Sequence, residues 1–532
     1  MTLQSLFCGI YNGIQSRRQR KKLKRRRAIL PRAPTSKDPK RPSFINLPND
    51  ILWQIVYLLQ DTSPSSVTRL VSVCSSLHAT ARRIQHRRVS INLNSPPVGG
   101  DEDSDTRDRL EHMSRCGLLP AVRSLKVLAP VRRRPDGGSD EPDDLSFLVD
   151  LLLAMTALRG IKWDIHLWDR SFSTHFPPEP TSRAAESETQ LDKTDVPVED
   201  LLHTLTTCSN LVSLRAKITY VREQDCRDVS QALRQVLLSC PNLRALSLDL
   251  DYPRSGCFAH GPGPETGYLG LGLHNGERPP PLESLEILCY PWGQEFHAAR
   301  PCLYSRGYPE TGTEPEYWAN TFDWSRLRRL YDNTGRLAFS PHFASNLTAL
   351  KEVKFPACAP KQIPLMQDFF AQLPSTLEVI SIPKLAYAGG AEGITTRHGQ
   401  TLHKLEIHLR DWHTAASWAD SDEVITPHDL TILRSGIPNL QELSIDMARP
   451  ASDWPRATLD ILAGFPRLSR LTLCVELGQY GAPPLQPEIT KESVTELFRY
   501  LRARSPASLR RLYICAGVPP AESTDVVLTR AG

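Results

Sequence analysis

The sequence of 532 residues has little that would support a secreted or membrane-spanning protein. Its twelve cysteines are spread thinly, with no CxxC pair and no regular spacing. This argues against a disulfide-stabilised secreted domain and favours reduced thiols in an intracellular protein. The longest apolar stretch, residues 145–158, contains Asp150 and is too short to span a bilayer. Residues 1–14 lack the basic start and the small-residue cleavage site of a secretory signal, so we expect none.

Motifs that carry chemistry are also missing. The chain has no HExxH, GxSxG, Walker or EF-hand pattern. Its fifteen histidines are scattered. His403 and His408 flank one expected strand, but they lie too far apart for a metal pair without other ligands. We therefore expect no catalytic residue, no metal and no cofactor, and we predict that the chain is not an enzyme.

The positive charge is confined to the N-terminus. The formal net charge is +5, but residues 1–45 alone carry +12, which leaves −7 for the rest. The folded body is thus acidic, and the basic isoelectric point is no argument that the body binds nucleic acid.

Nine positive charges stand within residues 17–27, and at this density they predict a solvated, extended segment. We interpret it as a nuclear-import signal that would bind importin, which places the protein in the nucleus, the cytoplasm or both. A phosphate-binding arm, a mitochondrial presequence and a plain solubilising tail are the alternatives. The nine residues are Arg17, Arg18, Arg20, Lys21, Lys22, Lys24, Arg25, Arg26 and Arg27.

One small apolar pattern recurs twelve times: apolar, two variable residues, apolar, one variable residue, apolar. No copy can bury its edge alone, so the copies must stack, and a stacked array presents a long surface that typically binds a partner. We call the second apolar residue of each copy its anchor. The anchors are Leu125, Ile161, Leu214, Leu246, Leu285, Leu330, Val353, Ile380, Leu405, Leu443, Leu471 and Leu512.

Successive anchors are 23 to 53 residues apart, so long insertions must leave the array, most openly at residues 169–195, 252–281 and 290–323. The last insertion is rich in aromatic residues, which are favoured anchors at protein interfaces. We predict that it binds a target; the alternative is that its aromatics pin the insertion to the array. The predicted target-binding residues are Trp292, Tyr304, Tyr308, Tyr317 and Trp318.

A different pattern precedes the repeats. Residues 43–90 predict three short helices, the first opened by Leu47 and Pro48, with an apolar stripe through Ile51, Ile55 and Leu59. A bundle of this size is marginal, and its stripe is more apolar than such a bundle can hide by itself. We expect a partner to cover it.

Residues 43–90 resemble the F-box motif in the order and spacing of Leu-Pro, Ile, Leu and Val-Cys, although Leu77 stands where the family often has Trp. The resemblance implies docking on a Skp-type adaptor and, through it, on a cullin. The repeats resemble the leucine-rich class in pattern only. The residues that the resemblance implies for adaptor binding are Leu47, Pro48, Ile51, Leu52, Ile55, Leu59, Leu70, Val73, Cys74 and Leu77.

The expected fold class is α + α/β. It comprises a basic disordered tail (1–42), a three-helix F-box-like domain (43–90), an irregular leucine-rich-repeat solenoid with long loop insertions (91–516) and a C-terminal tail (517–532). The resemblance implies a substrate-recognition subunit of a cullin–RING, SCF-type E3 ubiquitin ligase in ubiquitin-dependent degradation, with no membrane partner. One alternative is a leucine-rich-repeat scaffold without a ligase role. Nucleic-acid binding through residues 17–27 is the weakest alternative, because the body is acidic.

Overall fold

The computed structural model describes residues 48–62, 67, 75–92, 102–132, 144–168, 198–219, 223–251, 271, 273, 276–290, 314–333, 335–340, 342–356, 362–408, 424–448, 453–475, 486–506, 509–516 and 524–529. The chain divides into two compact units, Met1–Arg82 and Arg83–Gly532, called unit 1 and unit 2 below. Among the described residues, no helix combines the length and the apolar character needed to cross a membrane.

Unit 1 contains helix α2 (Asn49–Thr62), and α4 (Ser75–Gln85) runs across the boundary between the units. The carbonyl of Pro48 starts α2 by accepting hydrogen bonds from the N–H groups of Ile51 (3.0 Å) and Leu52 (3.1 Å). Proline suits this place because the first turn of a helix has no use for its missing N–H.

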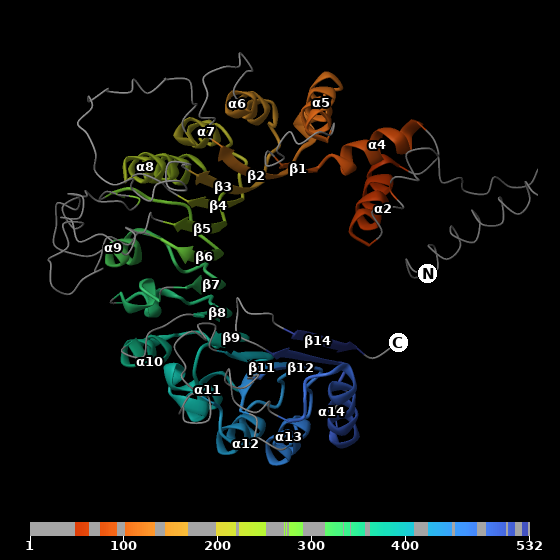
Figure 1. The fold of residues 1–532 in the computed structure, drawn as a ribbon. Coiled ribbons are helices and arrows are strands. Elements are labelled where there is room, and N and C mark those ends of the chain that lie inside the picture. The colour runs from red at the N-terminus through yellow and green to blue at the C-terminus, as the bar shows by residue number, and fades with distance from the viewer. Residues whose placement is uncertain are drawn as a thin grey trace, which may run out of the picture. The chain divides into compact units, whose positions relative to one another are not determined.

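Unit 2 is built on one 14-stranded sheet whose strands follow one another in chain order (Figure 1). Strands β1–β13 are all parallel, and β14 runs antiparallel to β13. The strands are β1 (Arg88–Asn92), β2 (Ser124–Arg132), β3 (Gly160–Trp168), β4 (Ser213–Thr219), β5 (Ala245–Asp251), β6 (Ser284–Cys289), β7 (Arg329–Asp332), β8 (Glu352–Lys354), β9 (Val379–Ile382), β10 (Lys404–Ile407), β11 (Glu442–Met447), β12 (Arg470–Val475), β13 (Arg511–Ala516) and β14 (Thr524–Thr529).

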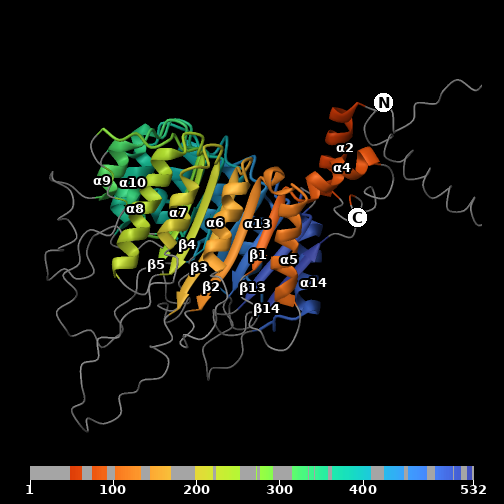
Figure 2. The ribbon, with the colours of Figure 1, turned by 90° about the horizontal axis from the view of Figure 1, so that it is seen from above.

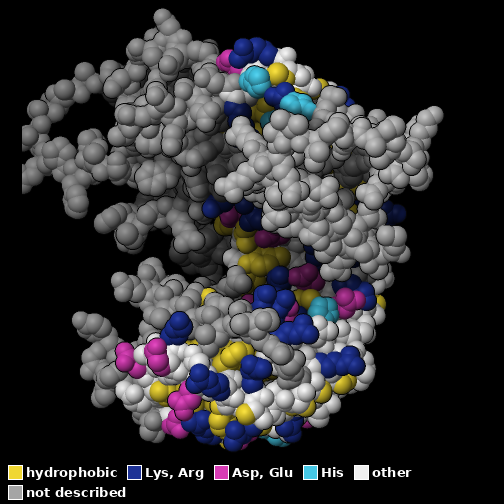
Figure 3. Space-filling model, turned by 90° about the vertical axis from the view of Figure 1, so that its right-hand side faces the viewer, with side chains coloured by type: hydrophobic (Ala, Val, Ile, Leu, Met, Phe, Trp, Pro, Cys, Tyr) yellow, Lys and Arg dark blue, Asp and Glu magenta, His cyan; other side chains and the backbone are white. Residues whose placement is uncertain are grey.

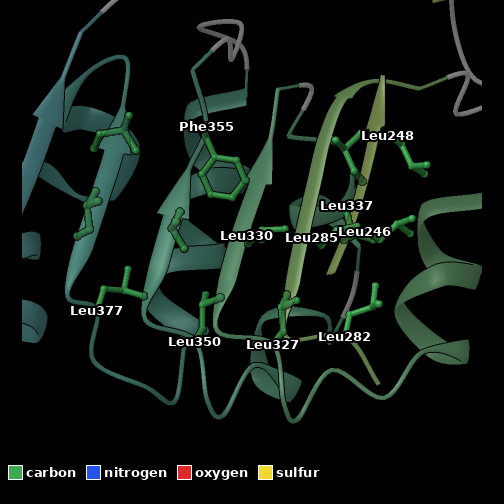
Figure 4. Close-up of a cluster of buried hydrophobic side chains, with 14 of the residues drawn as sticks. Leu246, Leu248, Leu282, Leu285, Leu327, Leu330, Leu337, Leu350, Phe355 and Leu377 are labelled. Carbon is green, nitrogen blue, oxygen red and sulfur yellow. The ribbon is translucent and has the colours of Figure 1, made fainter. Parts of the chain in front are cut away.

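The twelve anchors occupy one register position of this sheet. Leu125 of β2 pairs with Ile161 of β3, and the same pairing of anchor with anchor continues to Leu471 and Leu512. All twelve anchor side chains are buried in one continuous apolar core. Figure 4 shows part of this core, in which Leu246, Leu285 and Leu330 come from neighbouring strands.

A repeated hydrogen-bond pattern starts each strand from β2 to β13. Two consecutive N–H groups donate to a single carbonyl of the preceding repeat, as Arg123 and Ser124 do to Arg87 (2.9 Å each). We call this series the carbonyl ladder; it continues to Arg510 and Arg511, which donate to Ser469. It fixes the register of every parallel pair from β1 to β13.

Helices return the chain between most strands, and Figures 1 and 2 show them on one face of the sheet. Capping boxes start two of them, with Thr426 and Asp429 on α12 and with Thr490 and Ser493 on α14. The helices are α5 (Glu102–Arg115), α6 (Asp144–Ala154), α7 (Val198–Leu205), α8 (Glu223–Ser239), α9 (Glu314–Thr321), α10 (Ile363–Gln372), α11 (Gly390–His398), α12 (Pro427–Gly436), α13 (Arg456–Ala463) and α14 (Lys491–Arg504).

The predicted fold class, a three-helix F-box-like domain followed by an irregular leucine-rich-repeat solenoid, is wrong. Unit 2 is an α/β fold on a sheet with thirteen parallel strands. The six-residue pattern located the strands, but it did not show that β2 and β3 extend to nine residues and pair along that whole length. Of the three helices expected in residues 43–90, the structure describes α2 and α4; Val67 is also helical.

Candidate functional site

Helix α2 exposes apolar side chains on one face. Ile51, Ile55 and Leu58 follow the i, i+4, i+7 spacing that places residues on the same side of a helix. Ile51 is 40% exposed and Leu58 is 43% exposed, whereas the neighbouring Leu52 and Val56 are buried. Helix α2 therefore has an exposed apolar edge, formed by Ile51, Ile55 and Leu58, next to the side of the helix that is buried.

The residues predicted to bind an adaptor separate into three groups. Pro48 and Ile51 are exposed, Ile55 and Leu59 are half-buried, and Leu52 and Leu77 are buried in the core. The remaining four, together with the nine basic residues of the predicted nuclear-import signal (residues 17–27), lie outside the described residues: Leu47, Leu70, Val73 and Cys74.

The predicted target-binding aromatics are held in the core where the structure describes them. Trp318 on α9 is fully buried, with its ring 5.3 Å from that of Tyr290 and 5.1 Å from that of Phe322. Tyr317 is half-buried against the same core. This placement agrees with the alternative in which aromatics pin the insertion to the array. Trp292, Tyr304 and Tyr308 lie outside the described residues.

The sheet face opposite the helices, called the polar face below, carries the residues that alternate with the buried ones. Ion pairs join its neighbouring strands: Glu442 of β11 pairs with Lys404 of β10 (Nζ to Oε2, 3.8 Å) and with Arg470 of β12. Glu286 of β6 accepts a hydrogen bond from the Ser247 hydroxyl of β5 (2.6 Å). Over the described surface in Figure 3, residues of both charges stand among apolar ones. Such a face can bind a partner through hydrogen bonds and ion pairs.

Positive charge gathers on the first strands of unit 2. Lys126, Lys162 and Arg215 stand in register on β2, β3 and β4. At the residue before each of β2 and β3, Arg123 and Arg159 add two more charges. Burial, followed by repulsion from Arg87 and Arg159, lowers the pKa of Arg123. A partner with negative charge would relieve this repulsion.

A histidine, a carboxylate and a thiol meet at the other end of the sheet, and sequence reasoning missed them. Nδ1 of His408 lies 2.5 Å from Oδ1 of Asp446, and its Nε2 lies 4.0 Å from Sγ of Cys474. Aligning the repeats on their anchors would have found this group, because each member follows its anchor by three residues. The anchors concerned are Leu405, Leu443 and Leu471.

The comparisons with known proteins give no further indication of identity. No protein-family model matches the chain, and no curated protein matches it. The candidate sites therefore rest on the geometry described above.

Proposed function

We propose that the protein is the substrate-recognition subunit of a cullin–RING E3 ubiquitin ligase, with α2 docking on a Skp-type adaptor and the polar face of unit 2 binding the target. The observation that carries the proposal is the outward apolar edge of α2, formed by Ile51, Ile55 and Leu58. The F-box-like order of residues in the same segment supports the choice of adaptor.

The outward edge of α2 suits a groove on another protein. Amphipathic helices bind hydrophobic grooves through side chains at i, i+4 and i+7. Burying a whole Leu or Ile side chain contributes about 1.5–3 kcal/mol, so covering the exposed part of Ile51 or Leu58 would contribute about 1 kcal/mol each. Contributions of this size from several side chains distinguish a specific complex from a chance contact.

The charge on the first strands of unit 2 indicates the chemistry of the target. Lys126, Lys162 and Arg215 form a row of positive charge, in which Arg215 also pairs with Glu286 of β6 (Nη1 to Oε2, 3.8 Å), so an acidic segment of a target would complement Lys126 and Lys162 above all. Electrostatic complementarity of this kind raises the association rate and the specificity more than the affinity itself.

Adaptor retention tests the proposal. The double substitution Ile51→Glu/Leu58→Glu should abolish capture of a purified Skp-type adaptor by the full chain, because two carboxylates would have to be buried in an apolar groove of the adaptor. Leu153→Glu is the matched control: Leu153 on α6 is 52% exposed, and its substitution should leave capture unchanged.

Folding must be compared in all three proteins by circular dichroism and thermal melting. Equal capture by wild type and the double variant would refute docking through α2. If folded wild-type protein does not retain the adaptor, the ligase assignment fails, and a protein-interaction scaffold without a ligase role remains.

A further inference from the structure

Four potential metal-ligating side chains stand in one row at the carboxyl ends of strands β10–β13. Asp446, Cys474 and Cys515 are direct register partners on β11, β12 and β13. His408 immediately follows Ile407 of β10, whose partner is Ile445, so it continues the row next to Asp446. Since parallel strands bring equal register positions together, residues distant in the chain become neighbours here.

The row belongs to the polar face. Residues 443, 445 and 447 of β11 point into the core, and Asp446 alternates with them. Even so, the side chains are largely shielded from solvent: those of His408 and Asp446 are 15% and 9% exposed, and Cys474 is 4% exposed. Ionisable groups at such depth need specific partners.

The arrangement directs one imidazole nitrogen toward the thiol. Asp446 lies within hydrogen-bond distance of Nδ1 of His408 (2.5 Å), so that nitrogen carries a proton when the ring is neutral. Nε2 is then the acceptor nitrogen of the ring, and it faces Sγ of Cys474 at 4.0 Å. The ligand atoms of His408, Asp446 and Cys474 all lie within 4.8 Å of one another. A carboxylate that orients a metal-binding histidine through its other ring nitrogen is a common outer partner in metal sites.

We propose that unit 2 binds one Zn²⁺ ion through Nε2 of His408 and Sγ of Cys474, with Asp446 holding the imidazole in place and Cys515 turning in from the neighbouring strand as a second sulfur ligand. Cys515 qualifies because it is the direct register partner of Cys474 on the neighbouring strand, although its sulfur is not one of the ligand atoms that already lie within 4.8 Å of one another. One nitrogen and two sulfur ligands favour Zn²⁺ over Mg²⁺ or Ca²⁺, which prefer oxygen. Tetrahedral Zn²⁺ holds such ligand atoms about 3.3–3.8 Å apart, so the 4.0 Å separation needs only a small adjustment. Water would fill the fourth position.

A catalytic role for the same residues fits less well. The contacts of Cys474 with His408, and of His408 with Asp446, resemble those of a nucleophile, a base and an acid that orients the base. However, Cys474 is only 4% exposed, so a substrate would reach its sulfur only if the surrounding side chains moved. A nucleophilic cysteine lies in a partly exposed site. Zn²⁺ instead displaces the thiol protons, which pass to solvent as the metal–sulfur bonds form.

Metal titration of the full chain tests the proposal. Protein freed of metal with a chelator and kept reduced should bind one equivalent of Zn²⁺ in competition with a chromophoric chelator. With Co²⁺ it should show a near-ultraviolet thiolate-to-metal absorption band. Cys474→Ser should raise the Kd for Zn²⁺ at least 100-fold and remove most of this band. Asp446→Asn should raise the Kd 10–100-fold, because the imidazole loses its orienting partner.

Cys116→Ser provides the matched control. Sγ of Cys116 also lies near a histidine, 3.5 Å from Nε2 of His112, but the described residues place no third ligand beside that pair. This variant should keep the wild-type affinity. Melting of the metal-free variants monitors folding, and His408→Gln replaces Cys474→Ser if the latter unfolds. Sub-stoichiometric Zn²⁺ binding by wild type, a Co²⁺ spectrum without the thiolate band, or equal losses in the Cys116 and Cys474 variants would overturn the proposal.

Discussion

Two helices of equal length use their apolar side chains in opposite ways. α14 in unit 2 and α2 in unit 1 each have fourteen residues. α14 buries Val494, Leu497 and Leu501, starts with a capping box and ends with basic residues. α2 leaves Ile51 and Leu58 exposed and has no basic residue in its last turn. A single exposed apolar residue is not enough to indicate a partner, since Leu153 on α6 is 52% exposed. We interpret α2 as a docking helix because Ile51 and Leu58 are both exposed on the same side of it.

The largest expected effect is that of replacing a buried leucine on α14. Leu497→Ala should lower the free energy of unfolding by about 2–5 kcal/mol, because it removes buried methyl groups and leaves a cavity. Leu58→Ala on α2 should lower it by only about 1 kcal/mol, because part of this side chain is already exposed. Urea unfolding of both variants measures the difference. A comparable loss in the Leu58 variant would show that α2 is packed within its own unit.

Acid should lower the free energy of unfolding of unit 2 through His398, a buried residue of α11. Burial, and to a smaller extent Arg397, lowers the pKa of His398 on α11 from 6.5 to about 4. Its Nδ1 accepts a hydrogen bond from the N–H of Leu377 (3.2 Å), which only an unprotonated nitrogen can do. The unfolded chain binds the proton more readily, so this stabilisation is complete above pH 6.5 and is lost as the pH falls toward 4.

The loss over that interval should reach about 3 kcal/mol, as measured by urea unfolding at several pH values. His398→Asn offers a carbonyl oxygen near the position of Nδ1 and does not titrate. It should flatten this part of the pH dependence, and an unchanged slope would assign the effect to other groups.

The capping box of α14 gives a smaller effect. Thr490→Ala removes the hydroxyl that accepts the hydrogen bond of the Ser493 N–H (3.2 Å) and should destabilise unit 2 by about 1 kcal/mol. Thr495→Ala, in the middle of the same helix, should cost less, because its hydroxyl donates to a carbonyl that the helix already satisfies. Equal shifts in melting temperature for the two variants would contradict a capping role.

A substitution on the exposed side of α2 should change stability little but binding strongly, which would separate the role of α2 from that of α14. Leu58→Glu should change the free energy of unfolding by no more than about 1 kcal/mol, since the side chain is already 43% exposed. The same change should weaken adaptor binding strongly. A variant that loses both stability and binding would leave the exposed edge of α2 without a separate role.

The strands were predictable because their apolar spacing is local. All twelve anchors lie on paired strands. Two of these strands are preceded by the sequence Pro-Asn-Leu, at residues 241–243 and 438–440, and the structure shows what the asparagine does there. The side-chain amides of Asn242 and Asn439 donate to carbonyls of the preceding repeat, Ser209 at 3.0 Å and Gln400 at 2.9 Å. How far each strand continues beyond the pattern depends on its neighbours, so the single sheet was not predicted.

The candidate sites were harder to predict, because exposure and proximity arise from tertiary packing. Composition alone could not show that Trp318 would be enclosed by other rings. Neither could it bring His408, Asp446 and Cys474 together across separations of 38 and 66 residues. The apolar stripe of α2 was visible in the sequence, but which of its members face outward depends on what packs against them.

The reversed direction of β14 limits how this protein can grow in evolution. Tandem duplication lengthens a parallel array only where a new copy can present its leading N–H groups to the carbonyl ladder of the previous one. β14 occupies the edge of β13 in antiparallel register, from Arg511 opposite Thr529 to Ala516 opposite Thr524. An added copy at that terminus would find its template taken, so new repeats are expected to arise by duplication within the series.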